Sequence, residues 1–120
     1  MKSVRDALLE KYGNSQKDIV LDGADLISQK GYTLIPNYVL HTKKISALAK
    51  LVYAVLLSYA WGKKNSSFPG QQALIEDCGI SESTIRRAIR ELEANDFVTV
   101  IQRGQGKTNL YILHFVNKQR

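Results

Sequence analysis

Residues 79–92 read Gly-Ile-Ser-Glu-Ser-Thr-Ile-Arg-Arg-Ala-Ile-Arg-Glu-Leu, and this stretch decides the fold. Placed on a helix, it gathers four apolar side chains into a single stripe, those of Ile85, Ala88, Ile89 and Leu92. At roughly 100° per residue, three polar side chains point away from that stripe: Ser83, Arg87 and Arg90. The pattern predicts an amphipathic helix that packs by its apolar stripe and presents arginine on the other side.

A second short helix is predicted directly before this one, from Gln71 to Cys78. Its inward side is formed by Leu74, Ile75 and Cys78. Gly79 stands where such a helix would end in a left-handed residue. Ser81 is a suitable N-cap for the next helix, because its hydroxyl can accept the backbone N–H of Thr84. Two short helices joined by so tight a turn are typical of a helix-turn-helix, whose second helix enters the major groove of DNA.

The strongest helix in the chain is predicted over Ser46–Trp61, after a helical turn over Asn37–Leu40. One broad face gathers Leu48, Leu51, Val52, Val55, Leu56 and Tyr59. Because Lys50 is its only charged residue, we expect this helix to be the buried spine on which the others pack.

Two strands are predicted near the C-terminal end, at residues 97–102 and 109–113. Between them, Gly104 and Gly106 permit the positive φ angles of a hairpin tip. Residues 31–35 are also strand-prone and stop at Pro36, and Phe68 is placed to form a short bridging strand beside the hairpin. This order of elements predicts a mostly α protein with a small β-hairpin, an α+β fold of the winged helix-turn-helix type.

The N-terminal residues are less clearly patterned. Residues 3–12 fit an amphipathic helix through Val4, Ala7, Leu8 and Tyr12. The apolar groups at 19–21 and 26–27 are compatible with a turn of helix or a brief strand. We therefore expect an N-terminal extension over residues 1–30, a winged helix-turn-helix domain over 31–116 and a short tail over 117–120. The extension could pack on the domain, which is the favoured interpretation, or extend the DNA contact, or dimerise.

Composition favours a soluble globular protein with an anionic partner. The 120 residues are 44% hydrophobic and carry a formal charge of +6. Residues 30–64 hold six lysines and no acid, so the positive charge begins after the N-terminal segment. Cys78 is the only cysteine, which excludes an intrachain disulfide and favours a reducing compartment. Charged residues interrupt any secretory or membrane-spanning run, so we expect a cytoplasmic protein without a membrane partner.

The chain resembles a known family over about residues 32–113. The resemblance lies in Leu34-Ile35-Pro36-Asn37, Ala49-Lys50-Leu51-Val52-Tyr53, Ser67-Phe68-Pro69, Leu74, Cys78-Gly79-Ile80-Ser81, Thr84-Ile85, Arg87-Ala88-Ile89 and Glu91-Leu92-Glu93. These residues resemble the winged helix-turn-helix domain of replication initiators and small DNA-binding proteins of plasmids, phages and conjugative elements. The resemblance implies binding to double-stranded DNA, often at repeated sites in an origin of replication or transfer. Ile75 departs from it, because these helices usually carry a small residue there.

The helix beginning after Ser81 supplies the candidate DNA contacts, namely Ser81, Ser83, Thr84, Arg86, Arg87 and Arg90. A guanidinium can donate two parallel hydrogen bonds to the O6 and N7 of guanine. Hydroxyls in the first turn can reach bases or phosphates. The alternative is a solvated helix face with surface ion pairs, namely Arg87–Glu91 together with Arg86–Glu82 or Arg90–Glu93. The preceding turn favours DNA contact.

The hairpin tip and four lysines are further candidates. Arg103, Gln105, Lys107 and Thr108 on the tip could reach the adjacent minor groove or its phosphates, or form an ordinary exposed turn. Lys43, Lys44, Lys63 and Lys64 could neutralise phosphates, or serve solubility alone.

No enzyme signature is convincing, and we expect neither a cofactor nor a small-molecule substrate. His41 and His114 lie far apart, and neither has metal-ligand spacing with Cys78, so no metal site is expected. Cys78 fits a small core residue better than a nucleophile. Residues 104–107 lack the glycine spacing and the following helix of a phosphate loop.

These observations predict a sequence-specific double-stranded DNA-binding protein of a mobile genetic element, acting at an origin of replication or conjugative transfer. Self-association and contact with other replication or transfer proteins are compatible with this function. A transcriptional regulator is the close alternative, because its DNA chemistry would be the same. A winged helix that serves protein interaction or oligomerisation is the alternative from a different class.

Overall fold

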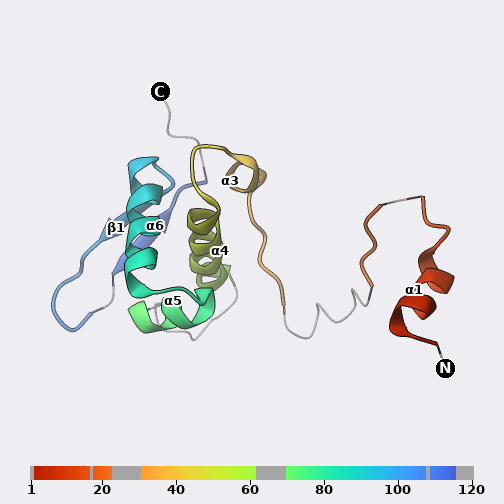
Figure 1. Ribbon diagram of the computed structural model, residues 1–120. Coiled ribbons are helices and arrows are strands. Elements are labelled where there is room, and N and C mark those ends of the chain that lie inside the picture. Colours follow the sequence, from red (N-terminus) through yellow and green to blue (C-terminus); the bar gives the residue numbers. More distant parts are fainter. Residues whose placement is uncertain (1, 17, 23–30, 62–69, 108, 116–120) are drawn as a thin grey trace. The chain divides into compact units, whose positions relative to one another are not determined.

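A computed structural model describes residues 2–16, 18–22, 31–61, 70–107 and 109–115. The chain forms two compact units, Met1–Gly31 and Tyr32–Arg120. The elements of the described residues, shown in Figure 1, are α1 (Val4–Tyr12), α3 (Asn37–His41), α4 (Ala47–Trp61), α5 (Gln71–Cys78), α6 (Glu82–Ala94), β1 (Val98–Ile101) and β2 (Leu110–Leu113). The larger unit has the predicted winged helix-turn-helix fold, mostly α with one antiparallel hairpin.

Helix α4 is the central element of the larger unit, as predicted, and it packs against α5, α6 and β2. Its buried face consists of Ala49, Val52, Tyr53, Leu56 and Leu57. The predicted inward face was wrong at two positions, because Leu48 and Leu51 are 43% and 40% exposed. Since α4 is apolar almost all the way round, its own pattern does not single out one face. The packing of α5 and α6 selects the face that is buried.

The α5–turn–α6 unit has the predicted form. Helix α5 buries Leu74, with Ile75 and Cys78 partly buried against the core, and it ends at Gly79 with φ +69°. That left-handed conformation lets the Gly79 N–H donate to the Ile75 carbonyl at 2.9 Å. Ser81 then caps α6 by accepting the Thr84 N–H at 3.3 Å.

The hairpin is antiparallel, with Val98 opposite Leu113 and Ile101 opposite Leu110. An aromatic cluster secures the end of the hairpin nearest α3. Phe97 stacks on Tyr38 with ring centroids 5.8 Å apart, and the Tyr38 hydroxyl donates to the backbone carbonyl of His114. The sheet therefore cannot shift along α3 without breaking a side-chain contact and a hydrogen bond.

The segment before α3 differs from its prediction. Residues 31–36 form no strand, although their composition is strand-prone, because among the described residues the sheet contains β1 and β2 only. A β-prone segment without a pairing partner remains irregular. The helical turn that follows is confirmed as α3, and Phe68 lies outside the described residues.

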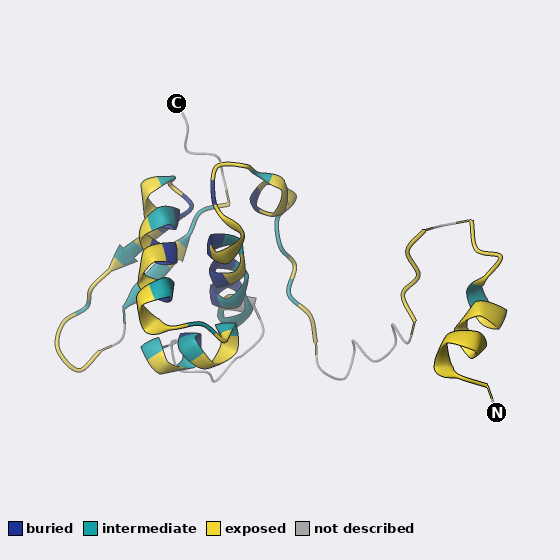
Figure 2. Cartoon of the chain, viewed as in Figure 1, coloured by how far each residue is buried: buried dark blue, intermediate teal, exposed yellow. Residues whose placement is uncertain are grey.

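The N-terminal unit contains α1, capped by the Ser3 hydroxyl as a helix beginning there requires. No residue of α1 is buried (Figure 2). The Tyr12 hydroxyl donates to Asp22 Oδ1 at 2.6 Å and closes the chain back over the helix. Residues 19–21 are neither helix nor strand, and residues 26–27 lie outside the described part.

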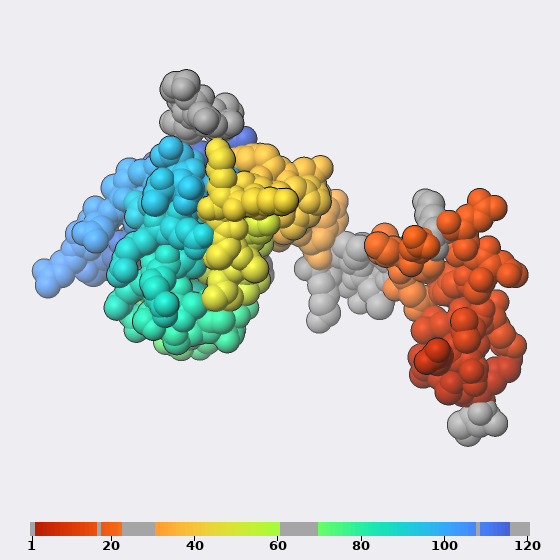
Figure 3. Space-filling model, turned by 45° about the horizontal axis from the view of Figure 1, so that its top comes forward, coloured from red at the N-terminus to blue at the C-terminus, as the bar shows by residue number. Residues whose placement is uncertain are grey.

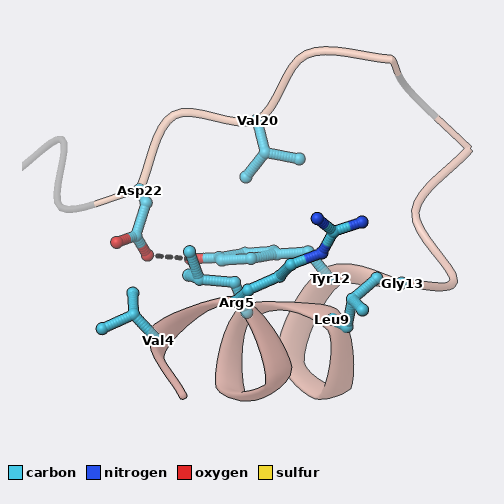
Figure 4. Close-up of a pocket in the computed structure, with 8 residues that line it drawn as sticks. Val4, Arg5, Leu9, Tyr12, Gly13, Val20 and Asp22 are labelled. Carbon is cyan, nitrogen blue, oxygen red and sulfur yellow. Dashed lines mark hydrogen bonds between the residues drawn. The ribbon is translucent and has the colours of Figure 1, made fainter.

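An open, mainly apolar hollow of 560 Å³ lies within this unit, between α1 and the segment at Val20 (Figure 4). Several apolar side chains that line it are exposed, including Val4 at 78% and Leu9 at 58%.

None of the helices in the described ranges is both long enough and apolar enough to span a bilayer.

Candidate nucleic-acid interface

Helix α6 divides sharply into a buried side and an exposed side. Its buried side is the predicted stripe, Ile85, Ala88, Ile89 and Leu92, none of which is more than 9% exposed. In Figure 2 the side of α6 turned toward α4 is buried, and the opposite side is exposed. Burial of these four side chains holds the helix against the core and leaves its opposite, exposed side available to a partner.

The exposed side carries the candidate contacts. The side chains of Ser83, Arg86, Arg87 and Arg90 are exposed, and Thr84 is partly buried. The three hydroxyls of the first turn lie together, since Ser81 Oγ is 2.8 Å from Thr84 Oγ1 and 3.3 Å from Ser83 Oγ. The structure thus brings hydroxyls to the N-terminal end of α6 and arginines to its middle.

Only one of the three ion pairs considered for this face forms among the described residues, the pair of Arg86 with Glu82. The Glu91 carboxylate instead accepts hydrogen bonds from Ser46, and Glu93 Oε2 accepts the backbone N–H of Val100 at 3.2 Å. The Arg87–Glu91 and Arg90–Glu93 pairs of the alternative do not form among the described residues, because Ser46 and Val100 donate to the two glutamates instead. Within the described residues, Arg87 and Arg90 make no hydrogen bond or ion pair.

The hairpin tip projects beyond the helices (Figures 1 and 3). Gly104 and Gly106 have φ of +104° and +79°, as the sequence predicted, and the Lys107 N–H donates to the Gly104 carbonyl at 3.3 Å. Gln105 and Lys107 are exposed, whereas Arg103 is partly buried and has interactions within the protein. Thr108 lies outside the described residues.

Lys43 and Lys44 are exposed in the loop that leads into α4. The contact between Ser46 and Glu91 brings the end of this loop to the C-terminal half of α6. Lys43 and Lys44 thus lie close in the chain to Ser46, which contacts α6. The large separation in sequence between these lysines and α6 does not reveal this. Lys63 and Lys64 lie outside the described residues.

The groups considered for metal binding or catalysis are not brought together. The described residues contain no group of three or more His, Cys, Asp or Glu side chains that could hold a metal ion. Cys78 packs against the core, and its burial raises the pKa of the thiol, which disfavours the nucleophilic thiolate. His41 is exposed on α3, and His114 Nε2 lies 2.8 Å from the Thr99 hydroxyl across the hairpin.

Comparison with known proteins agrees with this geometry. Residues 43–98 match a family described as "Helix-turn-helix domain". No curated protein matches the sequence. A solved structure described as "N-Terminal domain of DNA binding protein" is similar, with a TM-score of 0.51 and 14% identity over 82% of this chain and 84% of that chain. At that identity the similarity shows a shared fold alone. Residues 43–98, from the loop before α4 to the first residue of β1, are thus similar in sequence to that family, and they have the helix-turn-helix fold.

Proposed function

We propose that this protein binds double-stranded DNA at specific sequences, with α6 in the major groove and the hairpin tip beside it. One observation carries the proposal. The exposed side of α6 presents Arg87 and Arg90 without an acidic partner among the described residues, while the buried side is fixed to the core. Exposed guanidinium groups without an acidic partner, on a helix fixed to the core, can each donate two hydrogen bonds to guanine.

Other features support the same proposal. The first turn of α6 gathers three hydroxyls at a helix N-terminus, where phosphate oxygens are favoured. Lys43, Lys44 and Lys107 are exposed and add positive charge to the loop and the tip. The similar solved structure is described as a domain of a DNA-binding protein, which supports the same chemistry here.

Titration of a labelled duplex at several salt concentrations tests the proposal. Neutralising ~6 phosphates should give a slope of about −5 in the logarithm of the association constant against the logarithm of salt concentration. Single-stranded DNA of the same length serves as the comparison. A protein that does not bind the duplex at low salt would not have the proposed function.

Within DNA binding, we propose that the protein marks an origin of replication or conjugative transfer on a mobile element. This proposal rests on the family resemblance of residues 32–113. Selection of bound sites from a random duplex library tests it. Direct repeats in the selected sites would favour an origin, whereas a palindrome would favour transcriptional regulation by a two-fold dimer.

A second candidate function is protein interaction through the N-terminal unit. The observation in its favour is the apolar hollow beside α1 together with the exposed side chains of Val4 and Leu9. Exposed apolar surface of this kind is typical of contact sites between proteins. Sedimentation of the full chain with and without duplex DNA separates the two, because an interaction module would associate independently of DNA.

A further inference from the structure

Helix α6 has a basic exposed face although the formal charges of its residues sum to zero. Its thirteen residues include three arginines and three glutamates. A helix of this composition presents a basic face only where its acids are turned to other partners. Glu82 remains with Arg86, but Glu91 and Glu93 both accept hydrogen bonds from other elements of the fold. The positive character of the face therefore depends on where these two carboxylates are held.

Glu91 is the more firmly held of the two. Its Oε2 accepts the backbone N–H of Ser46 at 2.6 Å, and its Oε1 accepts the Ser46 hydroxyl at 2.8 Å. Ser46 directly precedes α4, and its hydroxyl oxygen also accepts the Ala49 N–H at 3.2 Å. The carboxylate thus lies at the N-terminus of α4, where the helix dipole stabilises negative charge. Both of its oxygens are occupied.

Without Ser46, the ion-pair partner of Glu91 on α6 would be Arg87. The two residues are at i and i+4 on α6, a spacing at which oppositely charged side chains on a helix surface meet. The same helix forms such a pair at Glu82 and Arg86, where neither side chain has another partner among the described residues. The Ser46 donors therefore compete with Arg87 for one carboxylate, and in this structure Ser46 holds it.

We propose that Ser46 is a positioning residue for DNA binding, because it holds the Glu91 carboxylate away from Arg87 and so leaves that guanidinium available to a base. The inference rests on the proposed function for its consequence at DNA, but not for the competition itself. If the Ser46 hydroxyl is lost, Glu91 keeps only the backbone N–H of residue 46 on Oε2, and its Oε1 becomes free to pair with Arg87. Arg87 then approaches DNA with the Glu91 carboxylate beside it, and the negative charge of that carboxylate is unfavourable next to the DNA phosphates.

The competition can be measured without DNA. We compare the full chain with Ser46→Ala and with the double variant Ser46→Ala/Glu91→Gln, and follow the guanidinium N–H resonance of Arg87 by nuclear magnetic resonance. In Ser46→Ala this resonance should shift as the ion pair forms. In the double variant it should return to the parental position, because an amide cannot form an ion pair.

The consequence is measured with duplex DNA at one fixed salt concentration. Ser46→Ala should weaken binding by about threefold to tenfold in the parental chain, a part of what one arginine contact to a base contributes. The same change should have no effect in the Glu91→Gln background. Ser58→Ala is the matched control, since its hydroxyl donates to the Val55 carbonyl within α4 at 2.6 Å and it should leave binding unchanged.

A second variant covers the case in which Ser46→Ala lowers the folded fraction. Ser46→Asp retains an N-cap acceptor for α4 but repels the Glu91 carboxylate, so it should release Glu91 while keeping the helix start. The extra negative charge of Asp is present in both the parental and the Glu91→Gln backgrounds. Its direct effect on DNA affinity therefore cancels when the effects of Ser46→Asp in the two backgrounds are compared.

The outcomes separate the inference from the proposed function. If the Arg87 resonance shifts in none of the Ser46 variants, Ser46 and Arg87 do not compete for Glu91. A shift without any change in DNA affinity would overturn its role in binding. Equal weakening in the parental and Glu91→Gln backgrounds would assign Ser46 a purely structural role. Failure of the parental protein to bind duplex DNA would reject the proposed function, and the resonance shift would still decide whether Ser46 controls the pair.

Discussion

At the scale of single residues, the neighbours of an arginine decide whether it can serve as a contact. Arg86 and Arg87 are adjacent on α6, and both are exposed. Arg86 is paired with Glu82, whereas Arg87 makes no such pair among the described residues because Ser46 holds Glu91. Two side chains of the same type therefore differ in what they can offer to DNA.

Arg87→Ala should lower the affinity for a preferred DNA site by ~1–3 kcal/mol and relax selectivity at one base position. Arg86→Ala should cost less, because DNA must first compete with Glu82 for that guanidinium. Titration of the selected site and its single-base variants measures both effects. Equal losses for the two substitutions would contradict the distinction drawn between them.

Ile85 and Leu92 are the two residues of α6 that are 0% exposed, so the attachment of α6 to the core depends on them. Ile85→Ala should lower the free energy of unfolding by ~2–5 kcal/mol, through lost apolar contact and a residual cavity. Ile112→Ala is the matched control, because Ile112 is 40% exposed and its truncation should cost about 1 kcal/mol or less. Chemical denaturation measures both, and similar costs would refute the core assignment of Ile85.

At the scale of elements, the hairpin combines an anchored base with an open tip. At the base, Phe97 contacts Tyr38 face to face and Tyr53 edge to face, with centroids 5.8 and 6.5 Å apart. The tip is a turn with left-handed glycines and exposed Gln105 and Lys107. A base fixed to α3 and α4 gives the tip a defined position beside α6.

Lys107→Ala should weaken binding to all duplex sequences by similar factors, because an ammonium at the tip contacts phosphate and carries no base readout. The salt slope should become shallower by about 1. Affinities for specific and random duplexes, each measured over a range of salt, provide the test. A change in sequence preference would place Lys107 at a base edge instead.

At the scale of the whole molecule, three tyrosines join the helices to one another and to the hairpin. Burial raises the pKa of Tyr53 and of Tyr38. The hydrogen bond from the Tyr59 hydroxyl to Asp77, 2.6 Å long, joins α4 to α5 and raises the pKa of Tyr59 to about 12. In each case the folded protein favours the neutral phenol.

A raised tyrosine pKa has a definite consequence for stability. The contribution is fully present below the ordinary pKa of 10.0 and is lost as the pH rises from there toward the folded value, because the unfolded chain releases its proton first. Denaturation midpoints should therefore fall between about pH 10 and pH 12. Tyr59→Phe should flatten this fall, and Tyr32→Phe, at an exposed position outside the helices, serves as the control. An unchanged profile in Tyr59→Phe would contradict the role of its bond to Asp77.

Local pattern was sufficient for the elements around the turn. The stripe from Ile85 to Leu92, the Ser81 cap and the left-handed Gly79 were all predicted and are confirmed. Each depends on interactions within a few residues of the chain, such as a hydroxyl accepting an N–H three residues later. Amphipathic periodicity and capping are properties of a short segment, so the segment alone reveals them.

Tertiary structure decided the features that depend on distant partners. The chain by itself determined that α4 is a helix, but only the positions of α5 and α6 decided that Leu48 and Leu51 remain exposed. Likewise, the spacing of Arg87 and Glu91 indicates an ion pair, and Ser46 removes it from 45 residues away. Local periodicity follows from helix geometry, whereas the choice among competing partners depends on which groups the fold brings within hydrogen-bond distance.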